Sequence, residues 1–283
     1  MTEGISWGKM DSNGFNNSSV IHNPDILILG SSHMEATNVF QKYNTTNQLI
    51  ANLTNKKINL SVYNQGISGH NLLKCCQYLN KNAQNESIKY VIIETQQISF
   101  NTEEIESLLN NQLTNKSSHD SGFIVYLQKL PFFRLVWFQF EQGLLKLFLP
   151  KKETSEKNTR IEPMDIIENN YDKLFSYIKQ NSHDKRIVIF YHPTGKPQVS
   201  GNLEYSTDNN YLYQFGKSAL KYGIDFIDLT NETDKLWQVE HKTTHGFCTG
   251  TAFSGHLNKN GHNLAARCLA NYIFSQEMLD VSF

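Results

Sequence analysis

The feature that most constrains the fold is a series of short apolar runs, each ending at turn residues. The first run, DILIL, stops at Gly30. Runs of this length without polar alternation are typical of strands buried on both faces of a parallel sheet. The five predicted strands are Asp25–Leu29, Ile58–Tyr63, Tyr90–Ile93, Arg186–Tyr191 and Ile224–Asp228.

Segments with apolar residues at helical spacing separate these runs. Alternation of strands and helices predicts an α/β three-layer sandwich: a mainly parallel five-stranded sheet with helices on both faces. The predicted helices are a segment from Met34 onward, Asn71–Asn80, Ile105–Leu113, Phe123–Leu149, Ile166–Gln180, Tyr211–Tyr222 and Asn260–Phe274.

The length of 283 residues suits one generous domain. Residues 1–24 are polar and rich in Gly, Asn and Ser, and we interpret them as a separate N-terminal segment. Residues 25–283 are predicted to form a single domain with a helical insertion around residues 101–165. The charged stretch Lys151–Arg160 is the best linker candidate within it.

The charge balance argues against a nucleic-acid partner, because 26 basic residues oppose 27 acidic ones and no basic stripe stands out. No stretch approaches 18 apolar residues, so no membrane span is predicted. Cysteine and histidine spacing does not suggest zinc, and neither a metal nor a cofactor is predicted. The polar start fits a cytoplasmic protein, or an extracytoplasmic one whose anchor was removed. The oligomeric state stays open.

The first chemically suggestive segment is Gly30–Glu35, directly after the first predicted strand. A serine at a strand-to-helix turn stands clear of the sheet, and nearby backbone N–H groups can stabilise an anion. Ser32 is therefore a candidate nucleophile, provided that a base lies close to it. The simpler interpretation is a helix N-cap, where serine is common.

Two further segments are also predicted turns or loops that carry groups suited to catalysis. Asn64–His70 comes after the second predicted strand, and its glycines let the backbone present an N–H to a ligand. Gly255–His262 precedes the last helix, and His256 in it is a candidate general base. The simpler interpretations are an ordinary βα turn and a solvated loop histidine.

Taken in order, the three segments resemble the conserved blocks of the SGNH (GDSL-like) hydrolase and acyltransferase family, over roughly Asp25–Phe274. Gly30-Ser31-Ser32 resembles the Gly-Asp-Ser block, with Ser31 in place of Asp. The resemblance implies that Ser32 is the nucleophile and His256 its base. It also implies that the Gly69 N–H contributes to the oxyanion hole.

Two positions depart from the family pattern. The third block usually supplies an Asn side chain to the oxyanion hole. Ile98 stands near that position here, so Gln96 or Gln97 is the predicted substitute donor. The family often places Asp three residues before the histidine, where this chain has Phe253. An acid that orients His256 would then come from Asp228 or Glu35, or the serine and histidine would work as a dyad.

The resemblance implies a serine esterase or an O-acyltransferase. The Gly-Ser-Ser block looks like that of cell-surface polymer-modifying relatives. It favours an ester, especially an O-acetyl group, on a carbohydrate or cell-envelope polymer. His192-Pro193, after the fourth strand, would line the same site or simply end the strand. Two alternatives remain: an inactive polymer-binding module of the same fold, and a lipase with an apolar cleft formed by Phe132–Phe148.

Overall fold

The computed structural model describes residues 6, 8–111, 113, 163–247 and 253–280. The chain divides into two compact units, and nearly all described residues belong to the unit formed by Glu3–Leu113 and Met164–Phe283. Most of the predicted insertion and the whole predicted helix Phe123–Leu149 lie outside the described residues. Both therefore stay predictions.

The centre of the described unit is a five-stranded sheet in which every pairing is parallel. The strand order is β2-β1-β3-β4-β7. The predicted fold class is thereby confirmed. The strands are β1 (Ile26–Gly30), β2 (Val62–Gly66), β3 (Tyr90–Thr95), β4 (Arg186–Tyr191) and β7 (Asp225–Asp228).

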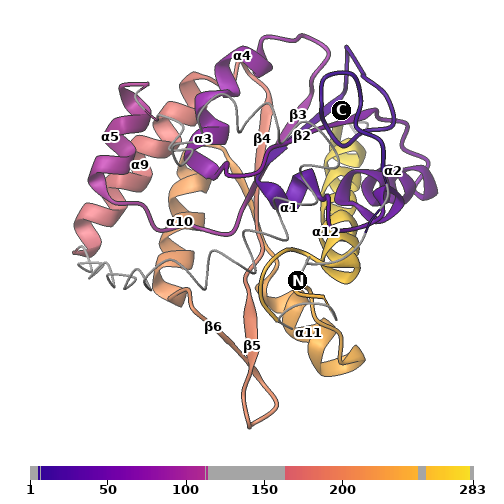
Figure 1. The fold of residues 1–283 in the computed structure, drawn as a ribbon. Helices are drawn as coiled ribbons and strands as arrows, with labels where there is room; N and C mark the ends of the chain where they lie inside the picture. Colours follow the sequence, from indigo (N-terminus) through magenta and orange to yellow (C-terminus); the bar gives the residue numbers. More distant parts are fainter. Residues whose placement is uncertain (1–5, 7, 112, 114–162, 248–252, 281–283) are drawn as a thin grey trace, which may run out of the picture. The chain divides into compact units, whose positions relative to one another are not determined.

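Successive side chains of β1 enter two different cores, which explains why the run is apolar without alternation. Ile26 and Ile28 pack on one face of the sheet, and Leu27 and Leu29 pack on the other. Four of the helices that pack on the Leu27 face are α3 (Leu72–Gln77), α5 (Thr102–Leu109), α9 (Met164–Gln180) and α10 (Asn209–Lys221). The opposite core is built with α1 (Ser32–Glu35), α2 (Thr45–Asn55) and α12 (Lys259–Asp280) (Figure 1).

The predicted position of the second strand was wrong. It begins at Val62, not at Ile58, and it continues through Gly66 instead of ending at Tyr63. Asn64 is tolerated inside the strand because both its side-chain nitrogen and its side-chain oxygen are hydrogen-bonded. The Nδ2 group donates to Met34 O at 2.7 Å, and Oδ1 accepts from Gly66 N at 2.8 Å.

Several other elements were missed or misplaced. The segment Asn71–Asn80 forms two short helices, α3 and α4 (Leu79–Ala83), and the helix expected from Met34 begins at Ser32. Helix α2 was not predicted because it is rich in Asn and Thr. Asn44 nevertheless caps it by accepting from Asn47 N. The remaining unpredicted elements are η1 (Gln41–Tyr43), α11 (Thr230–Glu240) and the antiparallel pair β5 (Gly195–Pro197) and β6 (Leu203–Tyr205).

Part of the polar N-terminal segment packs against the edge of the sheet. β2 is an outer strand, and the amide of Asn17 pairs with both backbone groups of Asn64. Nδ2 donates to Asn64 O at 3.0 Å, and Oδ1 accepts from Asn64 N at 3.0 Å. Asn17 therefore takes the place that a neighbouring strand would take. Asn16 adds a bond to Glu35 O at 2.8 Å.

Replacing Gly66 by alanine is expected to destabilise the fold strongly. A Cβ there would lie 2.3 Å from Glu35 N and 2.4 Å from Met34 C, so helix α1 would have to move away from β2. We expect a loss of about 3 kcal/mol or more in the free energy of unfolding, the upper end for overpacking. Urea unfolding measures this loss, and Gly201→Ala is a useful comparison because its Cβ would meet no atom within 4 Å and only its positive φ adds strain. Equal stability of the two variants would contradict the close contact.

Among the described residues, no helix combines the length and apolarity needed to cross a bilayer.

Candidate active site

Ser32 lies at the carboxyl end of β1, where the chain turns into α1. Ser31, in extended conformation, is the N-cap of this helix, and its side chain accepts from His33 N at 3.2 Å. Capping is therefore done by Ser31, which leaves the Ser32 hydroxyl free for another contact. The N-cap of helix α1 is therefore Ser31, the residue before the predicted nucleophile, and not Ser32 itself.

The hydroxyl of Ser32 meets the ring of His256. Ser32 Oγ and His256 Nε2 are 2.8 Å apart, although the residues are 224 positions apart in the chain. This is the distance at which an imidazole can take a proton from a serine nucleophile. The structure thus brings together the two residues that the sequence predicted as nucleophile and base.

Backbone contacts fix the loop that carries His256. Residues His245 and Leu257 form an isolated antiparallel bridge, and Gly246 N donates to His256 O at 3.0 Å. Leu257 N donates to His33 Nδ1 at 3.1 Å. Because His33 follows Ser32 in α1, this last bond ties the histidine loop to the helix that carries the serine.

The backbone N–H of Gly69, predicted as an oxyanion donor, and the backbone N–H of Ser32 are both open. Among the described residues, no acceptor lies on the N–H of Ser32 or of Gly69. Gly69 follows β2 in a left-handed conformation with φ of 81°, and a Cβ there would meet nothing within 4 Å. Both N–H groups can therefore donate hydrogen bonds to a charged oxygen.

The predicted side-chain donors have different surroundings. Gln97 is exposed, and its amide donates to Ser99 O at 2.7 Å. Gln96 is partly buried, and its Nε2 lies 2.6 Å from Thr194 Oγ1 and 3.2 Å from His245 Nε2. Gln96 thus faces a buried cluster of polar side chains, and its role as a donor to the oxyanion stays a prediction. Ile98, near the family's Asn position, is buried in the core.

The two acids suggested as partners of His256 are bonded elsewhere. Glu35 accepts from Ser68 N at 3.1 Å and also contacts the Ser68 hydroxyl. Asp228 accepts from Thr230 N at 2.9 Å and from Thr230 Oγ1 at 2.6 Å, at the start of α11. Glu35 thereby holds the loop before Gly69, and Asp228 holds a strand end. Their suggested role toward His256 is a prediction that these bonds do not support.

Beneath Ser32 lies a cluster that sequence reasoning did not assemble: Glu94, His33, His192 and His245. All four side chains are buried. Glu94 Oε2 accepts from Ser31 N at 2.7 Å, and Glu94 Oε1 lies 2.7 Å from His192 Nε2. His192 Nδ1 lies 3.1 Å from His245 Nε2, and His245 Nδ1 lies 2.9 Å from Thr244 Oγ1.

The electrostatics of the cluster keep Glu94 charged and two of its histidines neutral. Burial alone would raise the pKa of Glu94, but the hydrogen bond and charge of His192, with help from Ser31 N–H, lower it to about 2. Burial, reinforced by neighbouring histidines, lowers the pKa of His33 to about 3 and that of His245 to about 2. The same causes lower the pKa of the buried His262 to about 3.

The three cluster histidines each place one ring nitrogen within 4.8 Å of the others, a spacing that suggests a metal site. The donor set does not fit one. His33 Nδ1 accepts the N–H of Leu257, so in the neutral ring the proton sits on Nε2, the other ring nitrogen. A protonated nitrogen cannot bind a metal ion, and coordination through Nε2 would put an N–H against the Leu257 N–H. The cluster is better described as a hydrogen-bonded network.

One sequence signal pointed to this cluster. Glu94 ends the apolar run YVII, and a carboxylate in a strand buried on both faces needs a partner. His192 also follows an apolar strand directly, and parallel strands β3 and β4 are neighbours. The sequence does not show that β3 and β4 are adjacent. Without the strand order, the contact between Glu94 and His192 could not be predicted.

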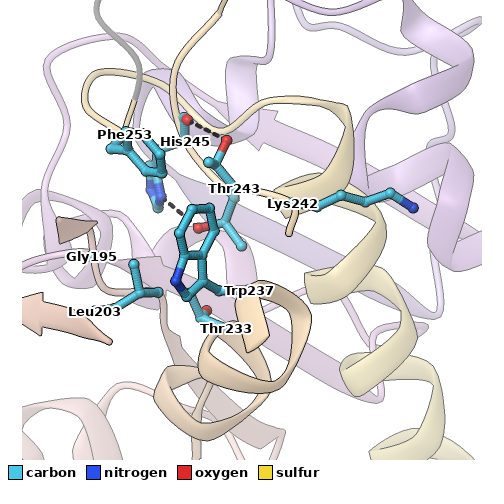
Figure 2. A pocket seen from close by; sticks show the side chains of 9 residues that line it. Gly195, Leu203, Thr233, Trp237, Lys242, Thr243, His245 and Phe253 are labelled. Atoms are coloured by element: carbon cyan, nitrogen blue, oxygen red, sulfur yellow. Dashed lines mark hydrogen bonds between the residues drawn. The ribbon is translucent and has the colours of Figure 1, made fainter. Parts of the chain in front are cut away.

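Phe253 occupies the position where the family often has Asp. Its ring packs edge-on against Trp237, with the centroids 5.4 Å apart. Together with His245 and Leu203 these rings line a cavity of about 10 Å³ (Figure 2). That space holds about one water molecule. The aromatic pair therefore packs beside His245, one member of the histidine cluster.

Neither a family model nor a curated protein matches the sequence. Solved structures do match. An α/β hydrolase from the metagenome of Lake Arreo, Spain, is 14% identical, with 88% of this chain and 94% of that chain covered and a TM-score of 0.48. An acetylxylan esterase from Geobacillus stearothermophilus is 13% identical, with the same coverage and a TM-score of 0.47.

A GDSL-like lipase from Parabacteroides merdae is 13% identical and covers 88% of this chain and 94% of its own, with a TM-score of 0.45. At these identities and TM-scores, the function of this chain has to follow from its own site.

Proposed function

We propose that this chain is a serine hydrolase of the SGNH type that cleaves ester bonds through an acyl-enzyme on Ser32. The observation that carries the proposal is the 2.8 Å contact between Ser32 Oγ and His256 Nε2. The open N–H groups of Ser32 and Gly69 support it, since a tetrahedral intermediate needs donors beside the nucleophile.

In the proposed reaction, Ser32 Oγ attacks the ester carbonyl while His256 Nε2 takes the hydroxyl proton. The carbonyl oxygen becomes an oxyanion and accepts from the N–H groups of Ser32 and Gly69. The bond between the acyl carbon and the alcohol oxygen then breaks, and His256 donates its proton to the leaving alcohol. In the second half, His256 takes a proton from a water molecule that attacks the acyl carbon. The bond to Ser32 Oγ breaks, the acid leaves, and His256 returns the proton to Ser32 Oγ.

The finer proposal concerns the substrate. We propose that the acyl group is small, most simply acetyl, and that the alcohol belongs to a carbohydrate or an envelope polymer. A sugar hydroxyl in place of water would make the enzyme an O-acyltransferase. This proposal rests on the Gly-Ser-Ser block, which looks like that of polymer-modifying relatives.

A fluorophosphonate probe tests the proposed chemistry directly, because it phosphonylates only an activated serine. We expect stoichiometric labelling, with the adduct on Ser32 in a peptide mass map. We expect His256→Gln to slow labelling by about 10³-fold or more, since the base is lost. Well-folded protein that does not react would favour the non-catalytic binding module.

Ester chain length then separates the remaining alternatives. We expect p-nitrophenyl acetate to be cleaved with a higher kcat/KM than the octanoate. A preference for the octanoate would favour the lipase alternative. Release of acetate from acetylated xylan, compared with transfer to an added oligosaccharide, distinguishes an esterase from an acyltransferase.

A further inference from the structure

The Glu94 carboxylate lies directly under the turn that presents Ser32. One oxygen accepts the backbone N–H of Ser31, the residue before the nucleophile, and the other contacts His192. A Cβ on Gly30 would lie 2.9 Å from Glu94 Oε2, closer than real Cβ atoms approach an oxygen. Glycine at position 30 therefore leaves room for both the Met34 side chain, whose Cγ would lie 2.4 Å from that Cβ, and the Glu94 carboxylate.

The same chain of contacts continues to the loop of His256. His192 Nδ1 meets His245 Nε2 at 3.1 Å, and the backbone of His245 is bridged to Leu257, the residue after His256. The next residue, Gly246, donates to the carbonyl of His256 itself. One continuous buried path thus joins the turn of the nucleophile to the loop of the base.

The partners of the buried carboxylate compensate for its removal from water. The hydrogen bond and charge of His192, with the Ser31 N–H, hold the pKa of Glu94 below its ordinary value. The carboxylate therefore stays charged and bonded to both partners at neutral pH. The path from it to both reacting residues indicates what it does.

We propose that Glu94, His192 and His245 form a clamp that sets the distance between Ser32 Oγ and His256 Nε2. They are positioning residues, since none of them contacts a reacting atom. The inference rests on the proposed esterase function. Displacing a reacting group by about 1 Å can cost about 10²-fold in rate, so even a small shift of the Ser31 turn would be measurable.

The test compares kcat and KM for p-nitrophenyl acetate in Glu94→Gln, Glu94→Ala and the unchanged protein. The glutamine keeps an acceptor for Ser31 N–H but loses the charge and the acceptor for His192. We expect kcat to fall about tenfold in Glu94→Gln and about 10²-fold in Glu94→Ala, with KM within about threefold. The rate of phosphonylation of Ser32 should fall by the same factors, because it depends on the same geometry.

Tyr90→Phe is the matched control. Tyr90 begins the same strand, and its hydroxyl contacts Glu277 Oε1 at 2.7 Å, so the variant also removes a hydrogen bond to a carboxylate. We expect it to change Tm without changing kcat. Each rate is divided by the amount of Ser32 that the probe labels, so that only folded protein is counted. If Glu94→Ala does not fold, His192→Gln takes its place.

The two proposals fail in different ways. If the chain is not a serine hydrolase, the unchanged protein neither reacts with the probe nor cleaves the ester. If only the clamp is wrong, the unchanged protein is active and Glu94→Gln retains kcat within twofold. A fall in kcat in Tyr90→Phe equal to that in Glu94→Gln would also overturn the clamp, because the loss would then follow stability alone.

Discussion

Ser32→Ala is expected to reduce kcat for p-nitrophenyl acetate by at least about 10³-fold, while the protein keeps its fold. The oxyanion donors and binding contacts survive the change, so a residual rate above that of water remains. Stability should change little, because Ser31 and not Ser32 caps helix α1. Steady-state kinetics and circular dichroism measure the two effects.

Ser87→Ala is the control for this prediction. Ser87 is similarly half-buried and its hydroxyl donates to Pro24 O at 3.0 Å, at the opposite end of the sheet from the site. We expect full activity. If Ser32→Ala retained more than about a tenth of kcat, another residue would have to be the nucleophile, and the acyl-enzyme mechanism would be wrong.

The second large effect is expected in acid. His33, His245 and His262 are buried with pKa values of about 3, 2 and 3, against an ordinary value of 6.5. Their folded pKa values are lowered, so the stability is fully present above pH 6.5 and is lost as the pH falls toward 3. Each histidine contributes a slope of about 1.4 kcal/mol per pH unit in this window.

Together the three histidines give about 4 kcal/mol per pH unit. A domain with a total stability of about 5–15 kcal/mol should therefore unfold between about pH 5.5 and 3. Glu94 also contributes to the loss of stability, but only below its ordinary pKa of 4.5. Its pKa in the folded protein is lowered to about 2, so its contribution disappears between these two values. Urea unfolding at intervals of half a pH unit measures the slope directly.

His262→Gln isolates one of these contributions. The glutamine can still contact Thr45 Oγ1, which lies 2.8 Å from His262 Nδ1, but it binds no proton. We expect the slope between pH 6.5 and 4.5 to fall by about a third. His22→Gln, at an exposed histidine, should leave the slope unchanged. A slope unaffected by His262→Gln would show that this histidine is not the source of the acid sensitivity.

The sheet was predictable from the sequence because its central strands β1, β3 and β4 are buried on both faces. A run such as RIVIFY has no polar face, so β4 has the predicted bounds. β2 was misplaced because VYNQG contains two amides, and only the contacts of Asn64 make them acceptable in a strand. Helix α11 was missed because polar residues fill most of it and only Thr233 is fully buried there among its described residues.

The pair of Ser32 and His256 was predictable because three segments, taken in order, resemble the blocks of the SGNH family, whereas each local signal alone also fits an N-cap or a loop histidine. Ser32 follows a strand that ends at Gly30, and His256 follows Gly255 before the last helix. The cluster around Glu94 was not predictable in the same way. Its members come from α1, β3, the end of β4 and the loop before α12, and the order of the strands decides whether they meet.

The amide of Asn17 blocks the middle of one border of the sheet, the outer edge of β2. An outer strand offers unpaired N–H and C=O groups on which another chain can continue the ladder. On the β2 side Asn17 already occupies both groups of Asn64 at the strand's midpoint. A shortened chain that begins at Asp25 would lose this blocking residue. Its β2 border would then be open to recruitment by a neighbouring molecule, and we would expect such a chain to self-associate more readily than the chain that retains Asn17.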